Sequence, residues 1–139
     1  LEEATALVSS RRLHRFVDKL TDLSDQGLDA EAFVQVIVRT LRMTLAEPVM
    51  KRLLGDEPEI LGELLASGHV AALVAQIAEL FTPVLRHAMG TGLLRAGDPA
   101  MAAEWIVRIV LVLTAVPAPD DELEATVRFV LLPMLDAGS

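Results

Sequence analysis

The chain has 139 residues, of which 53% are hydrophobic but only 4% aromatic, and it carries a formal net charge of −8. This length favours a single domain, which buries roughly two thirds of its extended surface, so a core without disulfides is feasible. The absence of cysteine excludes disulfides and thiolate chemistry, and the negative charge argues against direct binding to a nucleic-acid backbone.

The mean hydropathy of +0.46 is high, so a membrane span has to be considered. The longest stretch free of charge, 64–78, contains the polar residues Ser67, His69 and Gln76. A transmembrane helix needs about 20 predominantly apolar residues. We therefore expect no membrane segment, but more apolar surface than one domain can hide internally. With neither cysteine nor a signal peptide in the sequence, a cytoplasmic protein is favoured.

Helical periodicity recurs along the chain, whereas patterns typical of β-strands are nearly absent. The polar tract 21–29 is expected to form a loop after the first helix. Helices are expected over 2–20, 30–46, 48–55, 58–66, 69–89, 99–116 and 122–135. The sequence therefore predicts an all-α fold, an antiparallel bundle of about six to seven helices that forms one domain over residues 1–139.

Two aspartates have the position and the chemistry of helix N-caps. Asp29 precedes the second helix, and Asp98 precedes Pro99, a residue that suits the first helical position because no hydrogen bond is lost there. Asp121 and Glu124 have the spacing of a capping box, which predicts that the last helix begins beside them.

The last two helices are apolar on two sides. In 101–116 the apolar side chains cover an arc of about 200°, roughly twice what one buried face requires. Only Glu104 and Arg108 interrupt this arc, and they form a favourable i,i+4 pair. The helix 122–135 has the same character, and Pro133 is expected to end or kink it. Each helix therefore needs a second surface to pack against, besides the domain core.

A second copy of the chain is the most economical cover for these faces, because two-fold dimers dominate homo-oligomers. The alternative is that each helix is wrapped on all sides by its own domain, which is a simpler explanation for one helix than for two adjacent ones. We therefore expect a homodimer. The residues expected at its interface are Ile106, Val110, Leu113, Val127, Leu131 and Met134.

Patterns that carry catalysis or metal binding are missing from the sequence. His14, His69 and His87 are far apart, and none lies in the Glu-x-x-His pair that helical di-metal proteins use. No serine lies in a Gly-x-Ser-x-Gly turn, and the glycines of 90–92 are typical of a helix C-terminus. An enzyme is the function class with the least support, and no catalytic residue, metal or cofactor is expected.

The segment 92–113, GLLRAGDPAMAAEWIVRIVLVL, resembles the C-terminal domain of bacterial transcriptional regulators of the TetR type (TetR/AcrR). The resemblance is carried by a Gly-x-Leu-Arg turn, an Asp-Pro helix start and a Glu-Trp-apolar-Val-Arg run. Upstream of it, the segments 48–68 and 81–92 lie in the corresponding order. The resemblance thus covers most of the chain, from about residue 31 to residue 135.

This resemblance implies an all-α homodimer in which the last two helices of each copy form a four-helix interface. It also implies that a small effector changes the separation of two helix-turn-helix heads and releases operator DNA, as in a repressor. The head is absent from this chain, so the chain alone is not expected to bind an operator. A basic cluster would face that head, although such a cluster is usually a solvated helix face: Arg11, Arg12, His14, Arg15 and Lys19.

By the same resemblance, the effector would bind between the helices 30–46, 69–89 and 99–116. The expected lining residues are Phe33, Ile37, Thr40, Leu41, Thr44, Met50, Leu73, Ile77, Phe81 and Trp105. Hydroxyl groups beside aromatic rings and methionine suit an apolar ligand with one or two polar groups. Core packing is the alternative explanation for each of these residues.

A second function class stays open beside the sensor. The chain could be a stand-alone dimeric interaction module whose grooves receive a helix of another protein.

Overall fold

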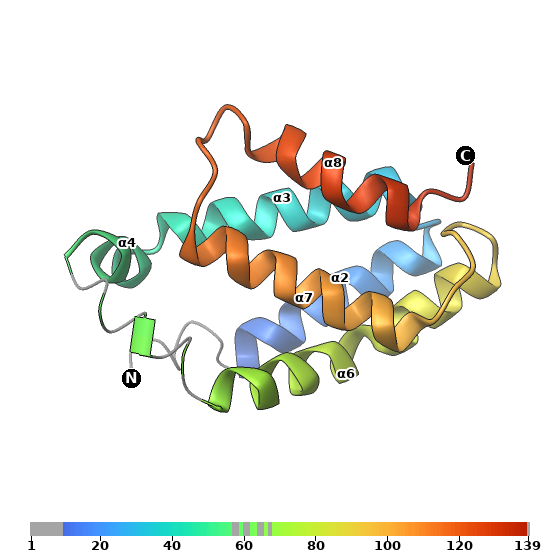
Figure 1. Cartoon of the computed structure of the whole chain (residues 1–139). Helices are drawn as coiled ribbons and strands as arrows, with labels where there is room; N and C mark the ends of the chain where they lie inside the picture. The colour runs from blue at the N-terminus through green and yellow to red at the C-terminus, as the bar shows by residue number, and fades with distance from the viewer. Residues whose placement is uncertain (1–9, 57–58, 60–61, 64–65, 67, 139) are drawn as a thin grey trace.

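The computed structural model describes residues 10–56, 59, 62–63, 66 and 68–138 (Figure 1). Within these ranges the chain is helical, and the only β-type contact is an isolated bridge between Leu94 and Asp136. The helices are α2 (Ser10–Asp25), α3 (Ala30–Ala46), α4 (Pro48–Gly55), α6 (His69–Gly90), α7 (Pro99–Ala115) and α8 (Leu123–Leu135). The predicted all-α class is confirmed.

Helix α2 continues into the tract 21–29 that the sequence predicts to be a loop, so this prediction was wrong for most of the tract. The reason is burial, because Leu20 is buried and Leu23, one turn later, packs against the core. Keeping both leucines on the same side requires the chain to stay helical. The loop is thereby reduced to 26–29. The first part of the predicted helix, 2–9, lies outside the described residues.

Helix α3 begins where the sequence predicts. The Asp29 carboxylate accepts a hydrogen bond from the backbone N–H of Ala32 at 2.9 Å, which satisfies one of the N–H groups that a helix start leaves unpaired. Helix α4 starts with Pro48 and ends at Gly55, also as predicted. The predicted helix over 58–66 falls mostly on residues outside the described ranges.

Helices α6 and α7 agree with the prediction to within one residue at each end. The Asp98 carboxylate caps α7 by accepting hydrogen bonds from the N–H groups of Ala100 at 3.0 Å and Met101 at 3.2 Å. Local chemistry therefore decides where this helix starts.

Helix α8 starts within one residue of the prediction, but its predicted side-chain cap is missing. It begins at Leu123 without a side-chain cap, so the predicted capping box of Asp121 and Glu124 was wrong. Leu123 is fully buried, and this apolar contact takes the place of a cap. Pro133 lies inside the helix, which continues to Leu135. The last turn persists because Leu135 is buried while Pro133 is on the exposed side.

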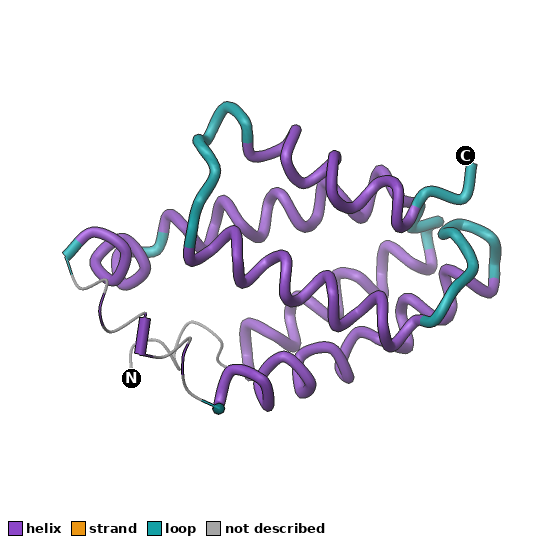
Figure 2. Tube along the Cα trace, viewed as in Figure 1, coloured by secondary structure: helices purple, strands orange, loops and turns teal. Residues whose placement is uncertain are grey.

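The helices pack in pairs. Helix α7 packs along α6, α8 packs along α3, and α2 lies against α6. The pairs are joined because α3 also contacts α7 and α2. Figures 1 and 2 place the loop 91–98 near the C-terminus at one end of the molecule, and α4 at the other end.

One core fills the space between these helices, and each large side chain buried in it contributes about 1.5–3 kcal/mol. Its fully buried members include Phe33, Ile37, Leu41, Phe81, Leu85, Ile106, Leu123, Leu131 and Leu135. None of the described helices combines the length and the apolar character that a membrane crossing requires.

Candidate functional site

Helix α7 carries a row of exposed apolar side chains on the side opposite the core. Met101, Trp105 and Val112 are each more than half exposed, as is Val116 directly after the helix, whereas Ala102, Ala103, Ile106, Val107 and Leu113 are buried. At 100° per residue, the three exposed apolar side chains of the helix lie within an arc of about 40°. Together with Arg108, which lies about 20° beyond this arc, Met101, Trp105 and Val112 form what we call the outer row of α7.

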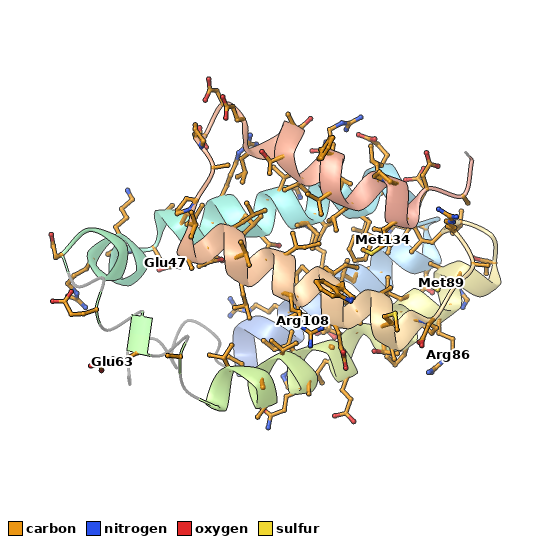
Figure 3. All side chains as sticks on the ribbon, viewed as in Figure 1. Glu47, Glu63, Arg86, Met89, Arg108 and Met134 are labelled. Carbon is orange, nitrogen blue, oxygen red and sulfur yellow. The ribbon has the colours of Figure 1, made fainter. Side chains whose placement is uncertain are left out.

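A charged pair accompanies the aromatic ring of this row. The guanidinium carbon of Arg108 lies 5.2 Å from the centroid of the Trp105 ring, and one guanidinium nitrogen is 3.4 Å from a carboxylate oxygen of Glu104. Figure 3 shows Arg108 on α7. Glu104 and Arg108 are both about half exposed, so water screens their attraction and the ion pair contributes little to stability. The arrangement holds Arg108 over the tryptophan ring.

Helix α8 has an exposed apolar side as well. The ring of Phe129 is 83% exposed and Val130 is 39% exposed, whereas Val127 and Leu131 are buried. Figure 1 shows α7 and α8 running in opposite directions, connected by the loop 116–122. Because α7 packs mainly on α6 and α8 on α3, each of the last two helices keeps one side in the core and one side in water.

Two aromatic side chains account for much of the apolar area that α7 and α8 expose. Phe129 and the half-exposed Trp105 together present roughly 300 Å² of aromatic surface, since a buried aromatic side chain covers about 150–250 Å². Met101 and Val112 on α7, and Val116 directly after it, add to this total. The summed area is comparable with the largest apolar patch on a typical monomer, which is about 300–600 Å² and is often functional.

The structure places most of the predicted dimer-interface residues inside a single chain. Ile106, Leu113, Val127 and Leu131 are buried, and the two others, Val110 and Met134, are partly buried and pack against the core. In Figure 3, Met134 lies between α8 and the helices below it in that view. These side chains stabilise the fold of one copy, and a different set of apolar side chains is left in water.

Four of the predicted effector-binding residues belong to the packed core. Phe33, Ile37, Leu41 and Phe81 are at most 2% exposed. The Phe81 ring meets Phe16 of α2 edge to face, with ring centroids 6.3 Å apart. For these four residues, packing within the chain accounts for their apolar character.

The other predicted effector-binding residues are more accessible. Thr40 is partly buried and its hydroxyl donates a hydrogen bond to the carbonyl of Val36 at 2.8 Å. Thr44, Leu73 and Ile77 are also partly buried, while Trp105 lies on the outer row and not with the rest. The side chain of Met50 lies outside the described residues. The structure thus brings part of the predicted set together in the core and separates Trp105 from it.

Two surface hollows lie elsewhere. One, with a volume of about 400 Å³, is lined by residues of the loop 91–98, by Met89 and by the C-terminal segment 136–137. The other, of about 460 Å³, lies along α2 beside Arg15 and Asp22. Figure 3 shows Met89 at the end of the molecule that holds the first hollow. None of the predicted effector-binding residues lines either hollow.

Two ion pairs in the described part of the chain join separate elements. Arg128 of α8 donates a hydrogen bond to the carboxylate of Glu31 on α3, and this contact raises the pKa of Arg128. Arg42 of α3 lies 3.7 Å from Asp120 in the loop before α8. Among the described residues, no three acidic or histidine side chains gather into a group that could hold a metal ion.

The residues that the sequence analysis did not assign to an interface are Met101, Val112, Val116, Phe129 and Val130. One signal could have identified those on α7. Glu104 and Arg108 mark the solvent side of that helix, and the exposed Met101 and Val112 lie within about 40° of Arg108 in helical angle. Comparison with protein-family models, with curated proteins and with solved structures found no match to this chain.

Proposed function

We propose that this chain is the effector-binding and dimerisation domain of a TetR-type transcriptional regulator, a repressor that senses a small apolar molecule. Its helix-turn-helix head would precede residue 1. The observation that carries the proposal is the exposed apolar surface on α7 and α8, the last two helices. Two such helices from each of two copies would form a four-helix interface.

The composition of this surface supports dimerisation. A stable interface buries about 800 Å² on each partner, and the two aromatic rings supply roughly 300 Å² of that. Trp and Arg are the residue types that most often dominate binding energy in interfaces, and Trp105 and Arg108 lie together in the outer row of α7. Burying this row removes apolar area from water on both copies at once.

Helix α2 would couple movements of the domain core to the DNA-binding head. Phe16 of α2 contacts Phe81 of α6, so a displacement of α6 would be transmitted to α2 by direct packing. The same helix exposes the basic or titratable side chains His14, Arg15 and Lys19. These residues would then lie between the domain core and the DNA-binding head.

The effector would enter at the end of the bundle where α4 lies. The C-terminal end of α3 and the N-terminal end of α6 point toward this end in Figure 1. Four of the predicted lining residues are only partly buried: Thr40, Thr44, Leu73 and Ile77. A ligand could therefore contact them without displacing fully buried core side chains. Their mixture of hydroxyl and aliphatic groups suits an apolar molecule with one or two polar atoms.

The proposal is tested by thermal unfolding of the chain with a panel of apolar compounds that carry a single carboxyl, hydroxyl or amine group. A compound present at 100 times its Kd stabilises the folded state by about 2.7 kcal/mol, which raises Tm by roughly 10 °C for a domain of this size. Thr44→Val, which keeps the shape and removes the hydroxyl, is expected to reduce the shift. A panel that shifts neither protein contradicts the sensor function.

The coding sequence upstream of Leu1 provides a second test. An in-frame stretch that encodes a basic three-helix unit with a helix-turn-helix supports operator release. A start codon or an unrelated domain at this place would overturn that part of the proposal and leave the dimer untouched.

One observation favours a second candidate, a dimeric interaction module. Four of the predicted effector-binding side chains are buried in the core, whereas apolar side chains on α7 and α8 are exposed to solvent. An exposed helical surface of this kind also suits an amphipathic helix of another protein. Both candidates are dimers, so the oligomeric state does not separate them. They are separated by the thermal-unfolding panel, because only the sensor is expected to be stabilised by a small apolar compound.

A further inference from the structure

The outer row of α7 has the same spacing in both directions along the helix. Met101, Trp105, Arg108 and Val112 are separated by four, three and four residues. The alternation of three and four keeps all of them on one side of the helix, as in the seam between two packed helices. The order is apolar, aromatic, cationic and apolar, so its two middle members are chemically complementary.

Two-fold symmetry gives this order a consequence. A helix that crosses a two-fold axis runs antiparallel to its own copy, and the same surface is used on both sides. We place the axis midway between positions 105 and 108. A residue of one copy then faces the residue of the other copy that lies equally far from this midpoint in the opposite direction along the chain. Trp105 then meets the partner's Arg108, and Met101 meets the partner's Val112.

We infer that two copies of this chain associate through α7 in this register, with Trp105 of each copy stacked against the partner's Arg108. The inference names the partner surface and the residues that determine self-recognition, and it rests on the dimer of the proposed function.

The side chains of one copy are already arranged for this contact. Arg108 lies over its own Trp105 ring at 5.2 Å and contacts Glu104 at 3.4 Å, so its charge is balanced and its position on the outer row is held. Attraction between a guanidinium and an indole ring increases when both leave water. A parallel arrangement of the two helices would instead place Arg108 against the partner's Arg108. Two like charges would then meet in an interface from which water is excluded, which is unfavourable.

The test uses two single variants, Trp105→Arg and Arg108→Trp, mixed with each other and with the unsubstituted chain. Alone, W105R places arginine against arginine at both symmetric contacts, and it is expected to be monomeric at concentrations where the unsubstituted chain is dimeric. Mixed with R108W, it regains an arginine–tryptophan contact at both places. Both positions are exposed, so equal helicity and Tm in circular dichroism check that the variants fold.

The expected result, measured by analytical ultracentrifugation with one protein fluorescently labelled, is a one-to-one heterodimer of W105R with R108W. Its Kd should be at least about tenfold lower than that of W105R with the unsubstituted chain, which restores only one of the two contacts. Equal affinity of W105R for both partners, or no heterodimer in either mixture, overturns the register but leaves the dimer of the proposed function intact. An unsubstituted chain that stays monomeric up to millimolar concentration overturns both.

Discussion

Phe129→Ser is the most direct perturbation of the proposed dimer surface on α8. The ring is 83% exposed, which corresponds to roughly 170 Å² of the about 200 Å² that a phenyl side chain can bury. If half of this exposed area leaves water on dimerisation, each ring contributes about 2 kcal/mol at about 25 cal/mol per Å². The substitution acts on both copies, so we expect Kd for the dimer to rise by about 100- to 1000-fold.

The same substitution is expected to leave the fold of one copy almost unchanged, because a side chain exposed to this degree makes few contacts in the monomer. Exposed substitutions of this kind change the free energy of unfolding by about 0.5 kcal/mol or less. Met43→Ser is the matched control, since Met43 is also a large exposed apolar residue, 67% exposed, but lies on α3. It should change neither Kd nor the unfolding of the monomer.

Sedimentation velocity over a concentration series, together with urea unfolding at a concentration where the protein is monomeric, measures both quantities. A Kd for F129S within threefold of the unsubstituted chain would show that α8 lies outside the interface. Equal weakening by M43S would show that loss of exposed apolar area in general, and not this face, governs association.

Three further substitutions test the fold. Phe81→Ala removes a buried ring that contacts Phe16 and is expected to lower the free energy of unfolding by about 3–5 kcal/mol in urea titrations, whereas a loss below 1 kcal/mol would contradict a packed core at this position. Asp98→Ala removes the cap of α7 and should cost about 1 kcal/mol, while Asp98→Asn, which keeps an acceptor oxygen, should cost clearly less in the same titration. Arg128→Gln breaks the link to Glu31. Because this contact raises the pKa of Arg128, its stabilising effect is complete at neutral pH and, on the alkaline side, is lost when the guanidinium loses its proton at strongly alkaline pH. The shift of the urea midpoint caused by R128Q should therefore be the same at pH 7 and pH 9, and a shift that disappears at pH 9 would contradict this assignment.

Local chemistry is sufficient to predict most of the helices and several of their ends. Asp29 and Asp98 cap helices through hydrogen bonds to N–H groups two or three residues further along the chain. Pro48 at the start of α4 acts equally locally. Such signals depend on neighbours in the sequence and are independent of the rest of the fold, so they can be recognised without a structure.

One helix end and one helix cap were mispredicted because distant contacts outweighed local signals. Leu23 keeps α2 helical through a polar tract by packing against the core. Helix α8 starts at the buried Leu123, between Asp121 and Glu124, without the predicted side-chain cap. Full burial of a leucine such as Leu123 contributes about 1.5–3 kcal/mol, and the partial burial of Leu23 contributes part of this. Capping preferences, in comparison, contribute about 1 kcal/mol.

The sequence alone determines that α7 and α8 have more apolar surface than one core contact requires, because periodicity reports how wide the apolar arc is. Which part of that arc faces inward is decided by the tertiary structure. Ile106 and Trp105 are neighbours with similar apolar character, yet Ile106 is buried and Trp105 is half exposed. The difference arises because α6 packs on one side of α7, and the position of another helix is a long-range contact that the periodicity of a single helix does not contain.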